Sequence, residues 1–170
     1  MKTQELLDII ERDWAREQPD IDTTAMLTVI GVQRLSALLE HELEEFFAPF
    51  GLTPSSFDML VTLRRSAPPE GLALSRLSAL MAITPPAVTK RVDLLAVRGL
   101  LERRSDAGDR RTVLARLTTT GRELADRALT RHVANEERLL LGLTLLESAQ
   151  LRMLVGKFAA HLEELREQKK

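Results

Sequence analysis

Apolar residues recur with a helical period through most of this chain, as in helices that bury one side. Outside the central part, the spacing predicts five helices whose ends are marked by proline, glycine or capping residues: about 3–17, 24–48, 54–65, 119–143 and 145–167. The last of these begins at a capping box, Thr144-Leu145-Leu146-Glu147. The protein is therefore predicted to be mainly α-helical.

The stretch from Ser75 to Thr118 predicts two further short helices followed by two strands. Ser75 is expected to cap a helix that runs through Ala82. Thr84 is expected to cap the next helix, because two prolines then fall where a missing N–H costs nothing. An apolar stripe and a terminal glycine define that second helix: Val88, Val92, Leu95 and Gly99. Two helices joined by so short a turn are typical of a helix-turn-helix.

A basic β-hairpin is expected directly after this helix pair. Leu100 to Arg104 and Val113 to Leu117 are strand-like, and the second alternates, with Val113, Ala115 and Leu117 on one face. The connecting loop, SDAGDRR, is rich in turn formers and ends in two arginines. A short strand at 72–74 is expected to join the hairpin. A helix-turn-helix followed by such a hairpin is a winged helix, whose basic tip suits a narrow minor groove.

Composition limits the class of protein. The 170 residues have a formal net charge of −1, 44% apolar residues and no cysteine, which predicts one folded domain without disulfides. There is neither an apolar run long enough to span a membrane nor an N-terminal pattern typical of a signal peptide, so we expect a cytoplasmic protein. Residues 84–118 hold eight Lys/Arg and four Asp/Glu, whereas the remainder is acidic. This local excess favours phosphate contact, although a solvated surface would look the same.

Helical geometry selects the residues that could read DNA. With Val88 at the centre of the buried side, the helical rotation of about 100° per residue identifies which positions lie on the exposed side of that helix. The candidates for the major groove are Thr84, Pro86, Thr89 and Lys90. Ser75 and Arg76 could hold the DNA backbone at the start of the preceding helix, and Arg104 and Arg110 could contact phosphates from the wing. Each could also be an ordinary surface residue.

The wing carries a family resemblance. The segment GLLERRSDAGDRRTVLARLTTTGREL resembles the wing of MarR-type transcriptional regulators, whose motif is Asp-x-Arg followed by an apolar strand ending in Leu-Thr. Here the motif is Asp109 to Arg111, followed by Val113 to Thr118. The resemblance covers roughly 24–165 and implies that Arg111 enters the DNA while Asp109 holds it.

The same resemblance implies an organisation and a function for the whole chain. It implies a single MarR-type domain over 1–170, with a winged helix-turn-helix at 53–118 and helical dimerisation regions at 1–50 and 119–170. It also implies a homodimeric repressor on a pseudo-palindromic operator. The apolar stripe of the last helix fits a dimer, although it could pack within its own subunit: Leu151, Leu154, Val155, Phe158, Leu162 and Leu165. Alternatives are a ligand-independent DNA-binding protein and a winged helix that docks on protein.

Two charged residues raise the question of a ligand. Asp58 lies inside the otherwise apolar run FDMLVTL, where a carboxylate is costly unless it is paired or near solvent. Arg91 lies about 60° from the centre of the buried stripe of its helix and needs an anion. One interpretation is a structural ion pair between Asp58 and Arg91.

A second interpretation comes from resemblance to the urate-responsive, PecS-type branch of the family. Carried over, Trp14 lines the ligand, Arg91 and Arg103 hold its negative charge, and Asp58 is displaced by repulsion. The implied ligand is a small anion that is urate-like, aromatic or carboxylic. Its binding would move the helix that carries Arg91 and release DNA.

Catalysis and metal binding find no support in the sequence. The three histidines, His41, His132 and His161, fall on separate expected helices without ligand-spaced partners. Nucleophile-elbow, phosphate-loop and metalloprotease motifs are absent. We therefore expect a non-enzymatic protein without cofactor or metal.

Overall fold

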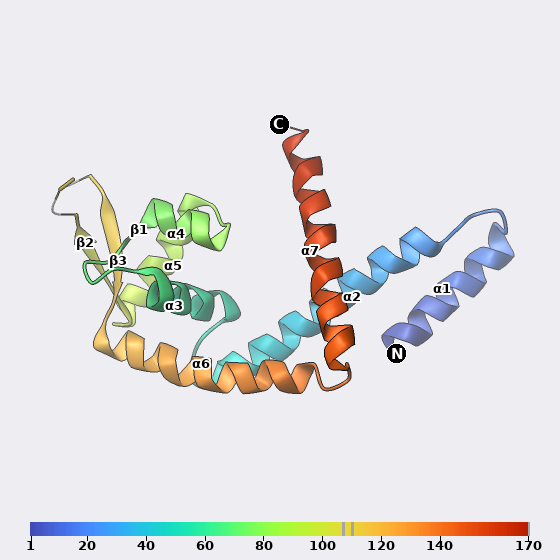
Figure 1. Ribbon diagram of the computed structural model, residues 1–170, viewed down its shortest axis with the longest axis horizontal. Helices are drawn as coiled ribbons and strands as arrows, with labels where there is room; N and C mark the ends of the chain where they lie inside the picture. The colour runs from blue at the N-terminus through green and yellow to red at the C-terminus, as the bar shows by residue number, and fades with distance from the viewer. Residues whose placement is uncertain (107, 110, 170) are drawn as a thin grey trace. The chain divides into compact units, whose positions relative to one another are not determined.

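The computed structural model describes residues 1–106, 108–109 and 111–169. The chain forms two compact units, Met1–Ala128 and Leu129–Lys170, and each is described by itself (Figure 1). Among the described residues, no helix is long and apolar enough to cross a membrane.

The first unit begins with two helices that pack against each other. They are α1, Thr3–Glu17, and α2, Thr24–Phe47, in agreement with the predicted ranges. Leu7 of α1 lies against Gly31 of α2. A one-turn helix, η1 (Ala48–Phe50), then ends at Gly51, whose φ of 64° is the left-handed conformation that glycine adopts easily.

The hydrophobic core is built around α3, Pro54–Ser66. Thr53 caps this helix, since its side-chain oxygen accepts a hydrogen bond from the Ser56 N–H at 3.1 Å. The Phe57 ring stacks on Phe47 with 4.4 Å between ring centres. The largest fully buried side chains come from four helices: Phe47, Met59, Leu60, Leu63, Leu77, Val88, Val92 and Leu95.

The predicted helix-turn-helix is present as α4, Leu74–Met81, and α5, Pro85–Val97. The expectation that Ser75 caps α4 was wrong. The N-cap is Ala73, because the strand that ends at Ala73 continues directly into the helix, and Ser75 therefore lies in its first turn. The predicted left-handed glycine after α5 is confirmed, as Gly99 has φ 69°.

Three strands form a small antiparallel sheet in the order β1-β3-β2. They are β1 (Leu72–Ala73), β2 (Leu101–Ser105) and β3 (Val113–Leu117), so the first hairpin strand begins one residue later than expected. Both faces of β3 contribute to the core, because Leu114 is buried as well as Ala115 and Leu117 on the opposite face. β3 is the central strand, and the chain at Gly71, just before β1, covers Leu114.

The turn between α4 and α5 depends on a residue that the sequence did not mark. Ala82 has φ 50° and ψ 39°, the only non-glycine with positive φ among the described residues. Because the alanine Cβ crowds the following carbonyl in this conformation, the turn carries a cost of about 1 kcal/mol.

We expect Ala82→Gly to relieve that cost and raise the free energy of unfolding by up to about 1 kcal/mol. Urea denaturation followed by circular dichroism measures the change. Ala79→Gly is the matched control, since Ala79 is an exposed position inside α4 where glycine should destabilise by roughly 0.5–1 kcal/mol. Equal destabilisation by both substitutions would contradict the account of this turn.

Two helices follow the wing. α6, Thr119–Leu139, begins in the first unit, and α7, Leu145–Glu167, lies in the second. The expected cap at Thr119 or Thr120 was wrong: Thr118 Oγ1 accepts from the Gly121 N–H at 3.0 Å, because strand β3 ends at Leu117. The capping box of α7 is confirmed, with Glu147 and Thr144 bonded to each other's N–H groups.

Candidate nucleic-acid interface

One side of α5 is buried and the other is exposed. Val88 and Val92 are fully buried and Leu95 nearly so, which confirms the predicted stripe. The sequence candidates lie on the opposite side, where Thr84, Pro86 and Lys90 are exposed and Thr89 is half-buried. A helix with this division can lay its exposed side in a major groove.

The start of α5 presents a hydroxyl that is free for another partner. Thr84 is the N-cap residue, but its side chain makes no capping bond, contrary to expectation. The reason is local: Pro85 and Pro86 occupy the first two helical positions, so one of the usual N–H donors is missing. Thr89 donates to the Pro85 carbonyl at 3.2 Å, and its oxygen lone pairs remain available as acceptors.

Ser75 and Arg76 are both exposed in the first turn of α4. Helical N–H groups of a first turn have no partner within the helix, and a cation there adds attraction for a phosphate. Both side chains are therefore accessible to an anion at the start of α4.

The wing tip is organised by two aspartates. Asp106 Oδ1 accepts from the N–H groups of Gly108 and Asp109 at 2.8 and 2.9 Å. Asp109 Oδ1 accepts from the Arg111 N–H at 3.0 Å, and its Oδ2 accepts from the Thr112 hydroxyl at 2.8 Å. The bonds to Asp109 lower its pKa, and the bond from the Arg111 N–H has the largest effect. The Asp109 carboxylate therefore stays ionised at neutral pH.

Asp109 thus holds Arg111 through its backbone, whereas the resemblance implied an acid that holds the arginine itself. The Arg111 side chain is exposed and has no ion pair within the described parts of the chain. Its guanidinium is consequently available to a ligand or to DNA. Arg110, the other expected phosphate contact at the tip, lies outside the described residues. Asp106 and Thr112 were missed by the sequence analysis, although Asp two or three residues before a glycine is a common turn signal.

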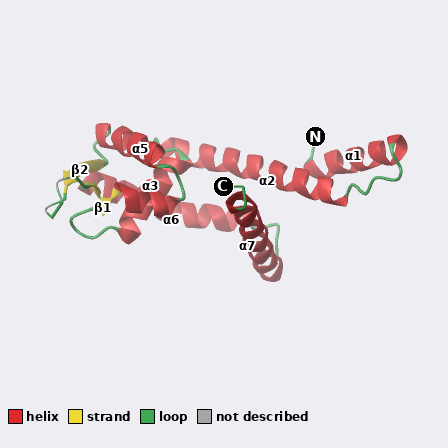
Figure 2. Cartoon of the chain, turned by 90° about the horizontal axis from the view of Figure 1, so that it is seen from above, coloured by secondary structure: helices red, strands yellow, loops and turns green. Residues whose placement is uncertain are grey.

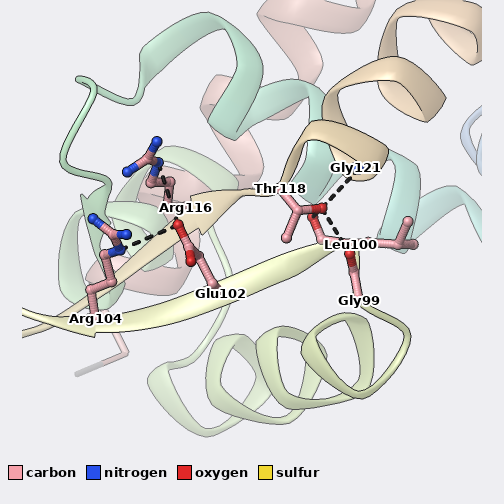
Figure 3. A network of polar contacts seen from close by, with 7 residues as sticks. All are labelled: Gly99, Leu100, Glu102, Arg104, Arg116, Thr118 and Gly121. Carbon is pink, nitrogen blue, oxygen red and sulfur yellow. Dashed lines mark hydrogen bonds and ion pairs between the residues drawn. The ribbon is translucent and has the colours of Figure 1, made fainter.

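The two arginines of β2 point to opposite faces of the sheet, as successive strand residues do. Arg103 forms a close ion pair with Asp93 of α5. Arg104 Nε lies 3.2 Å from Glu102 Oε1, and Arg116 Nε of β3 lies 3.5 Å from the same oxygen (Figure 3). Asp93 and Glu102 were not expected to take part, and the cross-strand register of Glu102 with Arg116 is the signal that could have indicated the second.

The ion pair between Asp58 and Arg91, one of the two interpretations of these residues, is not formed within the described chain. Asp58 is exposed, because the buried positions of α3 fall on either side of it, at Phe57 and Met59. Arg91 is half-buried, and within the part of the chain that is described neither side chain has an ion pair. Of the two ways in which a carboxylate in this apolar run avoids a cost, pairing or exposure to solvent, Asp58 shows the second.

Trp14 lies apart from the other residues expected to bind a ligand. It is half-buried on α1, and Figures 1 and 2 show α1 at the end of α2 that is remote from α5 and the wing. Arg91 and Arg103, in contrast, lie on α5 and on the strand that packs against it. One protomer does not assemble Trp14 with the two arginines.

Among the residues that the structure describes, no group of His, Asp or Glu side chains could hold a metal ion. The chemistry of this surface is that of guanidinium, ammonium and hydroxyl groups, which bind anions.

Comparison with known proteins agrees with this fold. The MarR family description matches residues 50–112. The transcriptional regulator PecS of Dickeya dadantii is 35% identical over 158 residues, which are 93% of this chain and 95% of PecS. AbsC from Streptomyces coelicolor, a MarR family regulator, superposes with a TM-score of 0.75 at 26% identity, over 85% of this chain and 97% of AbsC. CouR from Rhodococcus jostii RHA1, bound to p-coumaroyl-CoA, gives 0.64 at 26% identity, over 78% and 91%.

The helix pair and its β-hairpin define a winged helix-turn-helix protein. The chain belongs to the MarR family of DNA-binding transcriptional regulators, and the similarity to PecS supports its place in the PecS-type branch.

Proposed function

We propose that the protein is a homodimeric repressor that binds a pseudo-palindromic operator and releases it when a small anion binds. The observation that carries this proposal is the pairing of an exposed α5 side with a wing whose Arg111 guanidinium is free. Thr84, Pro86, Thr89 and Lys90 would read the major groove, and Arg111 would enter the minor groove beside it. Ser75, Arg76, Arg104 and Arg110 would contact phosphates.

A dimer is supported by apolar side chains that each unit leaves uncovered. On α2 these include Val29, Val32 and Leu35, which are 44–45% exposed. On α7 the predicted stripe has no buried member, and Leu154, Val155 and Phe158 are 38–58% exposed. Such contiguous apolar faces are typical of interaction surfaces, and a two-fold dimer would set recognition helices about 34–36 Å apart.

The ligand part of the proposal rests on Arg91. A half-buried guanidinium on the recognition helix without an acidic partner in the described chain attracts an anion. Arg103 would join it by leaving Asp93, and Asp58 would be repelled. Trp14 would then come from a second protomer, because α1 of the same protomer is remote. The structural neighbour CouR was solved with p-coumaroyl-CoA bound. This supports an anionic ligand with an aromatic part.

Mobility shifts on the DNA upstream of the protein's own coding sequence test the DNA-binding part. We expect a single complex whose affinity falls at least about 100-fold between 50 and 200 mM salt, since several phosphates must be contacted. An affinity that is indifferent to salt would contradict the proposal and favour a winged helix that docks on protein.

The same assay with urate, aromatic acids and small carboxylic acids tests the ligand part. One compound is expected to abolish the complex, and Arg91→Ala is expected to need at least about tenfold more of it. Arg127→Ala is the matched control, because Arg127 is exposed on α6 and lies outside both proposed sites. Unchanged release in Arg91→Ala and Asp58→Asn would overturn this part while leaving DNA binding in place.

A further inference from the structure

A cleft of about 530 Å³ lies at the base of the wing, inside the first unit. The end of α3 and the loop after it form one wall, and β2, β3 and the first turn of α6 form the other. Its lining combines apolar groups, among them Leu63, Pro68 and Leu117, with two arginines, Arg116 and Arg122. A volume of this size suits a small organic molecule.

The cleft carries an excess of positive charge. Arg122 is exposed and has no ion pair in the described residues, so its guanidinium is free to turn into the cleft. Arg116 is only partly neutralised, because Glu102 Oε1 is shared between Arg116 at 3.5 Å and Arg104 at 3.2 Å (Figure 3). The lining of the cleft therefore holds one carboxylate, that of Glu102, and two guanidinium groups, those of Arg116 and Arg122.

We propose that this cleft binds a small organic anion, separately from the ligand site proposed at Arg91. Arg116 and Arg122 would hold a carboxylate or phosphate group, which both match the forked geometry of a guanidinium. The apolar body of the molecule would lie against Leu63 and Pro68. The site is distinct because strand alternation turns Glu102 and Arg116 away from the sheet face on which Arg103 meets Asp93.

Glu102 gives the cleft a connection to the wing. An anion that pairs with Arg116 displaces Glu102 from that arginine. Glu102 then pairs with Arg104 alone. Because Arg104 is a proposed phosphate contact, the occupied cleft lowers the affinity for DNA. This step rests on the DNA-binding role proposed above, whereas the binding of the anion does not.

Isothermal titration calorimetry of the whole protein tests the site directly, with benzoate and phenyl phosphate as probes and benzamide as the neutral comparison. We expect one or both anions, but not benzamide, to bind, and Arg122→Gln to weaken binding at least about tenfold. Arg127→Gln is the matched control, since it removes the same charge from the same helix outside the cleft. A preference for one anion identifies carboxylate or phosphate as the group recognised.

Three results would overturn the site: no binding of either anion below about 1 mM, equal weakening by Arg122→Gln and Arg127→Gln, or loss of binding in Arg103→Gln instead. The coupling is tested by mobility shift with the anion that binds. We expect the anion to lower DNA affinity about two- to fivefold in the wild type and to have no effect in Glu102→Gln, where the shared carboxylate is gone. An equal effect in both proteins would overturn the coupling.

Discussion

Replacing Gly121 with alanine is expected to lower the free energy of unfolding by about 3 kcal/mol or more, a large share of the stability of a domain of this size. Gly121 is buried in the first turn of α6. A Cβ at this position would overlap the Leu100 carbonyl oxygen and lie 2.8 Å from the carbonyl carbon. Both atoms belong to the backbone, so no flexible side chain can move aside.

The same contact joins two parts of the first unit. Thr118 donates from its N–H to the Leu100 carbonyl at 3.1 Å and from its hydroxyl to the Gly99 carbonyl at 2.7 Å, while its oxygen accepts from Gly121 (Figure 3). These bonds fasten the end of α5 to the start of α6. A displaced α6 would break them, and their loss adds to the steric cost.

Urea denaturation measures the effect of Gly121→Ala, and Gly142→Ala serves as its control. A Cβ at Gly142 would meet nothing within 4 Å, so that substitution should change stability by less than about 0.5 kcal/mol. If Gly121→Ala unfolds at the same urea concentration as the wild type, the start of α6 does not lie against the Leu100 carbonyl.

Patterns that repeat along a single element were predictable from the sequence. The helical stripe of Val88, Val92 and Leu95 and the extended run of β3 are local consequences of which side chains leave water. The capping box of α7 was predictable for the same reason, since all its atoms lie within four residues.

Features that depend on how elements meet could not be predicted. Nothing near Gly121 indicates that the Leu100 carbonyl touches it, and nothing near Ala82 indicates a left-handed turn, for which glycine would be the usual choice. The ion pairs made by Arg103 and Arg104 depend on which strand face each occupies. The ion pair between Asp58 and Arg91 was not formed because even an apolar run leaves one side of a helix exposed, and Asp58 lies on that side of α3.

Replacing Arg111 with alanine is expected to produce the largest loss of DNA affinity of any single wing substitution in the described part of the chain. Its guanidinium is exposed and unpaired there, so binding need not break an existing contact, and the narrow minor groove concentrates negative potential. In a homodimer each substitution removes two such side chains. If each lost guanidinium costs about 1 kcal/mol or more of binding free energy, the affinity for DNA should fall at least about 30-fold.

Fluorescence anisotropy with labelled operator DNA measures this loss at fixed salt, with Arg127→Ala as the control for a lost surface charge.

Asp109→Asn refines the test, because it keeps Arg111 but weakens the charge-assisted bonds to the Arg111 N–H and the Thr112 hydroxyl. The lowered pKa of Asp109 means that these bonds stabilise the wing tip above the unfolded-state pKa and are lost as pH falls through the folded value. Asp109→Asn should therefore weaken DNA binding at neutral pH, by less than Arg111→Ala. If Arg111→Ala binds as tightly as Arg127→Ala, the wing does not enter the DNA, and the exposed side of α5 would have to supply the contact alone.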